Sequence, residues 1–303
     1  MIVVKIIGGL GNQMFQIAFA KSLSLEMNVD FFLDISAYKK YKIRNFSIHN
    51  LNFSNNIEFV DSLGLHSFQK KYFKVTQSLY RIYQKLLKII ISDLKIGSST
   101  YLFLSKFGLL YNFDPYYYEF KQTKNKVICI YGYFQSEKYF IKYRNLIREE
   151  FLVKTVPSTQ EKLLLKQIYN SNAVAVSMRL GEDYTNSSSL NVCSDDYYYR
   201  AIDLISNKLK NPTFYIFSDR IDIVKNNFNF KYNVIYVEGY NDYESLRLMY
   251  TCKHFVISNS SFSWWGSYLS SNKNKIVVAP SKWYSDTKET PHIYLDSMTL
   301  IEV

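Results

Sequence analysis

The chain has 303 residues, 48% of them hydrophobic, and a formal net charge of +11 at pH 7. This length allows a large buried core and suggests two domains of ordinary size. The charge predicts attraction to anions, whether phosphates, membrane lipids or nucleic acid. No apolar run is long enough to cross a bilayer, and the first residues lack the features of a signal peptide, so we expect a globular, cytoplasmic protein.

Potential metal ligands are scattered along the chain. The cysteines stand at positions 129, 193 and 252, the four histidines do not pair at helical spacing, and no two aspartates lie two positions apart. This pattern argues against a disulfide framework and against a metal held by the protein. We interpret the cysteines as small buried hydrophobic residues.

The N-terminal stretch is typical of a nucleotide-binding α/β unit. Ile2–Ile7 predicts a buried strand, Gly8–Gln13 a glycine-rich turn, Met14–Leu25 a helix and Val29–Leu33 the next strand. A strand, turn, helix and strand in this order often place a ligand beside the turn.

The glycines of this turn can be interpreted in two ways. Gly9 and Gly11 match the first two glycines of the dinucleotide fingerprint, Met14 occupies the third place, and Asp34 stands at the distance of a ribose contact. A nicotinamide-dependent reductase is therefore one hypothesis. The other interpretation is that the glycines only permit a tight turn with positive φ.

The middle of the chain has a less regular pattern. The segment from Arg81 to Ile96 has a basic and an apolar face, and predicts either a helix on a membrane surface or a core-packed helix with solvated lysines. Val127–Tyr131 predicts another strand. Pro157 then interrupts the pattern, and Ser158 with Glu161 has the spacing of a capping box that starts a helix.

A second α/β series follows this break. Short β-rich runs are AVAVSMRL, TFYIFSD, NVIYVEG, HFVISNS and NKIVVAP, and helical stretches separate the first four. We therefore predict an α/β protein with two Rossmann-like domains, residues 1–155 and 156–303, facing a cleft at the carboxyl ends of their strands.

Two polar turns of the second half carry candidate binding residues. In VSMRLGEDY a strand delivers Arg179 to its carboxyl end, where a guanidinium fork suits a diphosphate, although an ion pair with Glu182 or Asp183 is the structural alternative. In SNSSFSWWG the turn Ser258–Ser261 precedes a helix start, which favours anion binding. Trp264 and Trp265 are interpreted as core residues, because neighbours on a helix cannot both face one ligand.

Several blocks of the chain, in order, resemble the motifs of bacterial α-1,2-fucosyltransferases of glycosyltransferase family 11. These blocks are GGLGNQMFQIAFAKSL, YGYFQSEKYF, VSMRLGEDY, CSDDYYYRAI, FYIFSD and SNSSFSWWGSYL, and the resemblance continues to KIVVAPSKWY. The resemblance implies a GT-B fold with two Rossmann domains, GDP-fucose as donor, inversion at the fucose anomeric carbon and no metal. It also implies an acceptor that ends in β-galactose, carried on a lipid at the inner membrane face, and no nucleic acid partner.

The resemblance assigns roles to residues, and this chain departs from the family pattern at two places. Where such enzymes carry His-x-Arg-Arg-Gly-Asp, only Arg179 carries over as the diphosphate ligand, and Asp183 is the candidate base, with the leaving phosphate or a purely structural Asp183 as alternatives. Ser245 replaces a common aspartate, so guanine recognition is assigned to Glu244, with Asp242 or a helix-start carboxylate as alternatives.

The remaining site residues come from the other matching blocks. The first domain is expected to hold the acceptor, with Gly9 and Gly11 allowing close approach and Asn12 bonding the sugar or the departing phosphate. The second domain is expected to bind GDP-fucose through Arg179 and Glu244 together with Asp219, Asn259, Ser260 and Ser261.

Two other functions fit parts of the sequence. A reductase of the Rossmann type predicts tight dinucleotide binding, and a glycan-binding protein without enzymatic activity predicts sugar binding without affinity for GDP. Protection of the protein from heat by GDP and not by NADH would separate the transferase from both.

Overall fold

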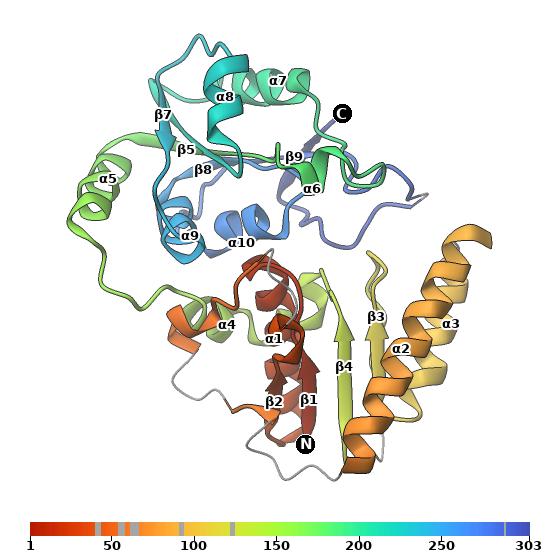
Figure 1. Ribbon diagram of the computed structural model, residues 1–303. Helices are drawn as coiled ribbons and strands as arrows, with labels where there is room; N and C mark the ends of the chain where they lie inside the picture. The colour runs from red at the N-terminus through yellow and green to blue at the C-terminus, as the bar shows by residue number, and fades with distance from the viewer. Residues whose placement is uncertain (40–43, 54–57, 61–66, 91–93, 122–124, 288) are drawn as a thin grey trace. The chain divides into compact units, whose positions relative to one another are not determined.

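The computed structural model describes residues 1–39, 44–53, 58–60, 67–90, 94–121, 125–287 and 289–303, with only the backbone described at 67–70, 87–90 and 94–96. The chain divides into two units. The first contains residues 1–49, 53–147 and 291–293, and the second contains residues 50–52, 148–290 and 294–303. Each unit has its own sheet with helices packed around it (Figure 1).

The first unit contains a parallel sheet in the order β2-β1-β4-β3. Its strands are short and almost fully buried, as expected for a parallel sheet that helices cover. The strands are β1 (Ile2–Lys5), β2 (Phe31–Asp34), β3 (Leu109–Asn112) and β4 (Ile128–Gly132). The helices are α1 (Leu10–Met27), η1 (Ser36–Lys39), η2 (Ile48–Asn50), α2 (Ser67–Ile90), α3 (Leu94–Ser105), η5 (Glu137–Tyr139), η6 (Ile141–Tyr143) and α4 (Arg144–Glu150), which continues into the second unit.

Helix α2 packs on one face of this sheet through Phe73 and Tyr80. These rings belong to one buried cluster that includes side chains of all four strands, among them Val3 and Tyr131. The expectation of a core-packed helix with exposed lysines is thus confirmed for its inner side, and the helix runs from Ser67 to Ile90. Of the rest of the expected segment, residues 91–93 lie outside the described residues, and residues 94–96 belong to the next helix, α3. In the part of the chain that the structure describes, no helix is long and apolar enough to span a membrane.

The second unit contains a parallel sheet in the order β10-β9-β8-β5-β6-β7. The strands are β5 (Asn172–Met178), β6 (Pro212–Ser218), β7 (Val234–Val237), β8 (His254–Val256), β9 (Val277–Pro280) and β10 (Met298–Ile301). The helices are α5 (Thr159–Asn170), α6 (Glu182–Thr185), α7 (Asp195–Ser206), α8 (Ile221–Asn227), α9 (Asp242–Thr251) and α10 (Ser261–Leu269). The expected α/β series is confirmed, because strands and helices alternate along this unit and all six strands join one parallel sheet. The apolar strand β5 lies in the interior of the sheet, between β8 and β6.

The helix that follows Pro157 begins as expected, but its capping differs. Ser158 Oγ accepts the N–H of Glu161 at 3.1 Å, which is one half of a capping box. The Glu161 carboxylate instead forms a buried, forked ion pair with Arg247 of α9, with N–O distances of 2.6 and 2.7 Å. Arg247 also donates to Thr155 O, so this pair joins α5, α9 and the segment before α5.

Buried tryptophans and cysteines confirm two further expectations. Trp264 and Trp265 are fully buried in α10, where their rings meet edge to face with centroids 5.0 Å apart. They are therefore core residues. All three cysteines are buried and free, and burial raises the pKa of Cys129 to about 12, so this thiol stays protonated.

The turn after β1 is shorter than expected. The N–H groups of Asn12 and Gln13 donate to Gly9 O, so the helical hydrogen bonds begin at Gly9 and α1 starts at Leu10. Gly11 therefore lies inside the helix. The positive φ belongs to Gly8, at 81°, whereas Gly9 has a φ of −79°. The interpretation that Gly9 and Gly11 serve positive φ was wrong.

Candidate active site

The carboxyl ends of three neighbouring strands gather the candidate residues of the second unit. From β5 the chain continues to β6 and β7 on one side, and then crosses to β8, which pairs with the other side of β5. Ligands of doubly wound sheets bind where the strand order reverses in this way. The segments that follow β5, β6 and β8 carry Arg179, Asp219 and Ser260 respectively.

The guanidinium of Arg179 is held by three side chains. Its Nη2 donates to Asp183 Oδ2 at 2.9 Å, its Nε lies 3.6 Å from Asp219 Oδ2, and its central carbon lies 5.1 Å from the centre of the Tyr184 ring. Partly exposed ion pairs contribute little to stability. This cluster therefore orients the guanidinium more than it stabilises the fold, and the alternative of an Arg179–Asp183 ion pair is observed.

Asp219 also fixes the backbone beside Arg179. Its Oδ1 accepts the N–H groups of Leu180 and Gly181 at 2.8 and 3.0 Å. A Cβ atom on Gly181 would lie 2.8 Å from Asp219 Oδ2 and 3.0 Å from Asp183 Oδ1. A side chain at position 181 would therefore force the carboxylate of Asp219 to move from this arrangement.

Tyr184 connects the Arg179 cluster to the protein core. Its hydroxyl donates to Asn259 Oδ1 at 2.8 Å and accepts the N–H of Cys193 at 3.0 Å. Burial raises the pKa of Tyr184 above its usual range, so the hydroxyl stays protonated as this network requires. The Asn259 amide donates to Leu190 O and to Trp283 O, both at 2.8 Å. Asn259 therefore positions Tyr184, and its expected contact with a donor stays a prediction.

The serine turn after β8 lies beside the end of β5. Ser258 N donates to Ser177 O at 3.2 Å, which ties this turn to β5. Ser260 is the N-cap of α10, and its side chain makes no capping bond to the helix. Ser258 Oγ is buried without a hydrogen-bond partner. A helix start with N–H groups that side chains do not cap suits a phosphate, so Ser260 and Ser261 stay candidates for the donor diphosphate.

The candidate for guanine recognition has a structural partner. Glu244 Oε2 accepts the N–H of Asn241 at 2.8 Å, and the two residues form a complete capping box at the start of α9. Asp242 lies in the same first turn. The helix-start alternative is thus observed for Glu244, and guanine recognition by either carboxylate stays a prediction.

In the first unit, two buried amide side chains hold the turn after β1. The Gln13 side chain is fully buried, donates to Gly8 O and Asn45 O, and accepts the N–H of Ser47 at 3.1 Å. Gln16, also fully buried, bonds both backbone groups of Ile7. These two amides hold the turn in shape, and the protein itself satisfies their hydrogen bonds.

Asn12 lies where the strand order of the first sheet reverses. Its Oδ1 accepts from Gln135 Nε2 at 2.8 Å, and Gln135 follows β4, the neighbour of β1. Gly9 faces the side chain of Arg44, since a Cβ atom at position 9 would lie 3.5 Å from it. Gly9 and Asn12 are brought together here, whereas Gly11 is buried inside α1.

Sequence reasoning named Arg179, Asp183 and Asp219 separately, and the structure brings them together. It did not name Tyr184 or Gln135, which contact Arg179 and Asn12. Both lie in sequence blocks that resemble the family motifs, and this resemblance is the signal that could have identified them. Among the residues that the structure describes, no group of histidine, cysteine or acidic side chains could hold a metal ion.

Comparison with known proteins adds the family and the fold. The model of the family described as glycosyl transferase family 11 matches residues 1–302. An alpha-1,2-colitosyltransferase of Escherichia coli is 29% identical over 291 residues, which cover 93% of this chain and 92% of the relative. The O-antigen biosynthesis glycosyltransferase WbnK of Escherichia coli is 28% identical over 309 residues, which cover 93% of this chain and 95% of the relative.

Solved structures with a similar fold include fucosyltransferases. NodZ α-1,6-fucosyltransferase, co-crystallized with GDP, has a TM-score of 0.53 and 11% identity, with 88% of this chain and 91% of that chain covered. NodZ from Bradyrhizobium has a TM-score of 0.51 and 10% identity, with the same two shares covered. The expected α/β fold class with two Rossmann-like units, of the GT-B type, is thus confirmed. Since the family model matches nearly every residue, the chain belongs to glycosyltransferase family 11.

Proposed function

We propose that this glycosyltransferase is an inverting galactoside α-1,2-fucosyltransferase. It transfers L-fucose from GDP-fucose to the 2-hydroxyl of a terminal β-galactose during synthesis of an O-antigen or another surface polysaccharide. The observation that carries the proposal is the Arg179 guanidinium, held by Asp183 and Asp219 at the reversal point of the second sheet. Family membership and the names of the relatives support a sugar-nucleotide donor.

In the proposed reaction, the galactose 2-hydroxyl attacks C1 of fucose while the bond from C1 to the GDP oxygen breaks. The transition state resembles an oxocarbenium ion, and negative charge grows on the diphosphate. Arg179 and the turn of Ser260 and Ser261 stabilise this charge. In the first unit, Gly9 and Asn12 contact the acceptor or the departing phosphate.

The ion pair of Arg179 suggests how donor binding prepares the base. Asp183 Oδ2 accepts the Arg179 Nη2–H in the structure. A diphosphate that takes the guanidinium fork competes with this bond and frees the Asp183 carboxylate to accept the hydroxyl proton of galactose. The alternative acceptor for this proton is the leaving phosphate.

A second candidate function is transfer of colitose to the same hydroxyl. The relative that is 29% identical carries the name of an alpha-1,2-colitosyltransferase. Colitose is fucose without its 3-hydroxyl, so the two donors present the same diphosphate and anomeric carbon. A site that bonds the 3-hydroxyl of fucose would reject colitose by about 10⁴-fold, because its polar groups would be left unpaired.

Direct assay of both donors tests the proposal. The purified protein is incubated with GDP-fucose or GDP-colitose and a panel of galactose-terminated disaccharides, and the linkage of each product is assigned by NMR. We expect α-fucose on the galactose 2-hydroxyl and a higher kcat/KM for GDP-fucose. A higher kcat/KM for GDP-colitose would assign colitose as the transferred sugar. A product on another hydroxyl of galactose would refute the proposed linkage.

We also propose that the reaction needs no metal and takes place on the cytoplasmic side, on a lipid-linked acceptor. In the motif VSMRLGEDY, the guanidinium of Arg179 can balance the diphosphate charge that a metal ion would otherwise balance. Activity should therefore survive excess EDTA. Loss of activity that manganese or magnesium restores would overturn this part of the proposal.

A further inference from the structure

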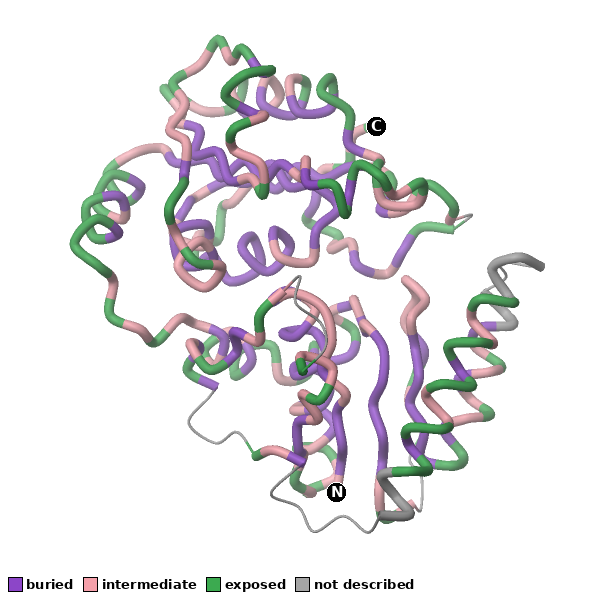
Figure 2. Tube along the Cα trace, viewed as in Figure 1, coloured by how far each residue is buried: buried purple, intermediate pink, exposed green. Residues whose placement is uncertain are grey.

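Helix α2 has three different faces along its described side chains. Successive residues of a helix are rotated by about 100° around its axis, which places Phe73 and Tyr80 on the side that faces the core. A row of residues at spacings of three and four lies on a second side and faces solvent. This outward row consists of Tyr72, Val75, Leu79, Ile82 and Leu86. Basic residues occupy the third face. Figure 2 shows the exposed outer side of α2 and the buried strands behind it.

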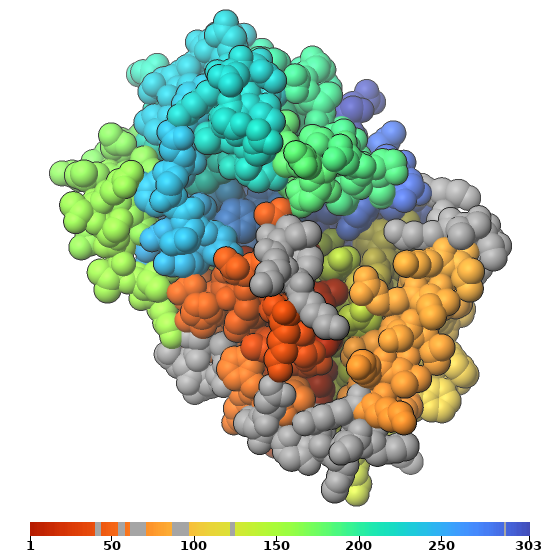
Figure 3. All heavy atoms as spheres, viewed as in Figure 1, coloured from red at the N-terminus to blue at the C-terminus, as the bar shows by residue number. Residues whose placement is uncertain are grey.

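The outward row is apolar and well exposed. Its five side chains are between 38% and 60% exposed, with Leu79 the most exposed. A single exposed leucine on a soluble protein needs no explanation, but a continuous row over four turns of one helix does. Figure 3 shows α2 at the surface of the first unit.

Two phenylalanines next to α2 extend this apolar surface. Phe103 of α3 and Phe107, which follows α3, are 58% and 53% exposed, and their ring centroids lie 5.3 Å apart. Between α2 and α3 lies an apolar pocket of about 520 Å³, and Leu79 and Phe103 both line it. We call Tyr72, Val75, Leu79, Ile82, Leu86, Phe103 and Phe107 the α2–α3 face.

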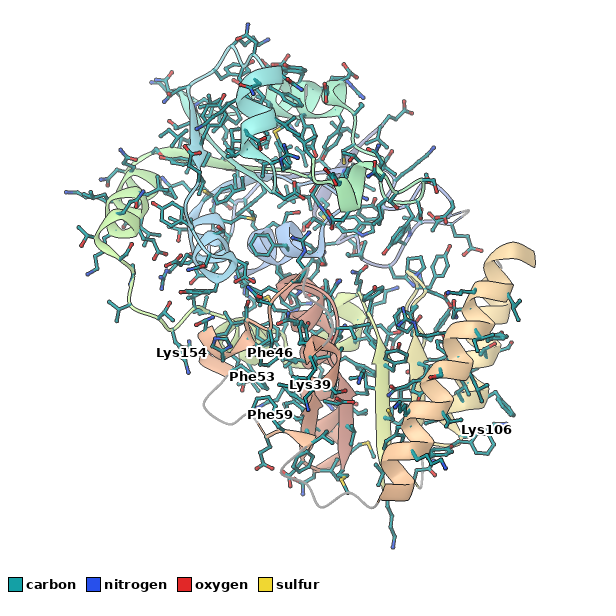
Figure 4. The ribbon with its side chains drawn as sticks, viewed as in Figure 1. Lys39, Phe46, Phe53, Phe59, Lys106 and Lys154 are labelled. Atoms are coloured by element: carbon teal, nitrogen blue, oxygen red, sulfur yellow. The ribbon has the colours of Figure 1, made fainter. Side chains whose placement is uncertain are left out.

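The described charged side chains that α2 and the residues just after α3 carry have one sign. Lys71, Lys74 and Lys85 are exposed on α2 beside the apolar row, and Lys106 is exposed between Phe103 and Phe107 (Figure 4). Neither α2 nor α3 contains an aspartate or a glutamate. An apolar row beside cations, without any carboxylate, is the pattern of a helix that lies at the interface of an anionic membrane.

The same charges argue against a second copy of this chain on the α2–α3 face. A symmetric helix pair would bury the apolar row, whose spacing of three and four residues suits such pairing. It would also place the lysines of α2 near those of the other copy, with no carboxylate on α2 or α3 to neutralise them. Like charges across helices are destabilising, whereas anionic lipid head groups attract lysines.

We propose that the α2–α3 face binds the surface of an anionic lipid bilayer. The apolar row and the two phenylalanines enter the interface, and the lysines contact the head groups. This inference does not rest on the proposed reaction, since binding is measured without a sugar nucleotide or an acceptor.

Cosedimentation of the full chain with lipid vesicles tests the proposal. We expect binding to phosphatidylglycerol vesicles at low salt, weaker binding at high salt, and little binding to phosphatidylcholine vesicles. Replacing Lys71 and Lys85 by glutamine should weaken binding about twenty-fivefold, since each lysine near the surface contributes about fivefold. The double change Leu79→Ser and Ile82→Ser should weaken binding about tenfold or more.

Helix α5 supplies matched controls in the second unit. Lys162, Leu163 and Lys166 are exposed there, and Leu163 is 64% exposed. Lys162→Gln with Lys166→Gln, and Leu163→Ser alone, should leave vesicle binding unchanged. All variants should keep the melting temperature, because the changed side chains are exposed, and also the rate of transfer to a soluble acceptor.

Three results would overturn the proposal. The first is no binding of the unchanged protein to phosphatidylglycerol vesicles at low salt. The second is equal loss of binding in the α2 and α5 variants. The third is a dimer by light scattering that becomes a monomer in the Leu79 and Ile82 variant, without vesicle binding, which would assign the α2–α3 face to a second copy.

Discussion

The turns after β1 and after β5 occupy equivalent places in the two sheets and are built from different chemistry. Each follows a strand at the point where the strand order reverses. The turn after β1 is surrounded by glycine and amide groups, and Gln13 and Gln16 are fully buried there. The turn after β5 has a guanidinium between two carboxylates.

The difference shows that topology fixes where a ligand can bind, whereas side chains decide which chemistry occurs there. Buried amides hold the first turn in shape through hydrogen bonds to its backbone. The charged cluster of the second turn suits a diphosphate whose charge grows during the reaction. Changes to the charged cluster of the second turn should therefore alter the reaction rate, and changes to the buried amides Gln13 and Gln16 of the first should alter stability.

The largest effect is expected from Asp183→Asn. If Asp183 is the base, kcat should fall by about two to four orders of magnitude, because asparagine cannot accept the proton, while GDP-fucose binding is retained. Steady-state kinetics and calorimetric titration of GDP measure the two quantities. Asp196→Asn is a matched control, since Asp196 forms a similar ion pair four residues from Arg200. A near-normal kcat would assign the proton to the leaving phosphate.

The next effect is expected from Arg179→Lys. Lysine keeps the charge but not the forked donors, and the diphosphate gains charge only as the glycosidic bond breaks. The loss should be roughly 2 to 4 kcal/mol of transition-state stabilisation, and it should appear mainly in kcat. Arg200→Lys changes an arginine of α7 that also pairs with an aspartate, and should leave kcat unchanged. Wild-type kcat in folded Arg179→Lys would mean that Arg179 does not hold the leaving group.

A smaller effect, on stability, is expected from Gln13→Ala. The change removes the Gln13 bonds to the N–H of Ser47 and to the carbonyl of Asn45, whereas Gly8 O still accepts from the Tyr38 hydroxyl. Unfolding free energy should fall by roughly 1 to 3 kcal/mol, the cost of buried unsatisfied polar groups. Chemical denaturation measures it, with exposed Gln167→Ala as the control that should change little. An unchanged stability together with a large loss of kcat would refute the contrast between the two turns.

Much of the fold could be predicted from the sequence because it depends on local patterns. The continuous apolar run before Arg179 fits a buried parallel strand, and Ser158 marked the start of α5 correctly. The start of α1 was misplaced because glycine and asparagine are weak helix formers, so Gly11 and Asn12 resembled a turn. There, hydrogen bonds to Gly9 O and burial of the helix outweigh propensity.

The candidate site could be predicted only as separate residues. Asp219 bonds Leu180 across 39 positions, and Asn259 bonds Tyr184 across 75. No periodicity within a short window contains such partners. The second half of the expected capping box is not observed, because Glu161 pairs with Arg247, a partner 86 residues away that the local pattern does not contain.

The smallest effect on kcat is expected at Tyr184, whose ring contacts the Arg179 guanidinium after β5. Tyr184→Phe keeps the ring beside the guanidinium and removes the hydroxyl that Asn259 accepts from. Tyr184→Leu removes the ring as well. If the ring positions Arg179, Tyr184→Phe should keep kcat within about threefold, while Tyr184→Leu should lower it by about three- to tenfold, the size of a cation–π contribution of roughly 0.5 to 1.5 kcal/mol.

Both changes at Tyr184 lower stability, because Asn259 and the N–H of Cys193 lose a buried partner. A loss of positioning is therefore separated from a loss of stability by measuring kcat per folded molecule, at a temperature well below the melting transitions of both variants. A positioning role predicts that Tyr184→Leu changes kcat more than the KM for GDP-fucose, since the diphosphate needs the oriented fork most when the bond breaks. Equal losses of kcat in the two variants would assign the role to the hydroxyl network and not to the ring.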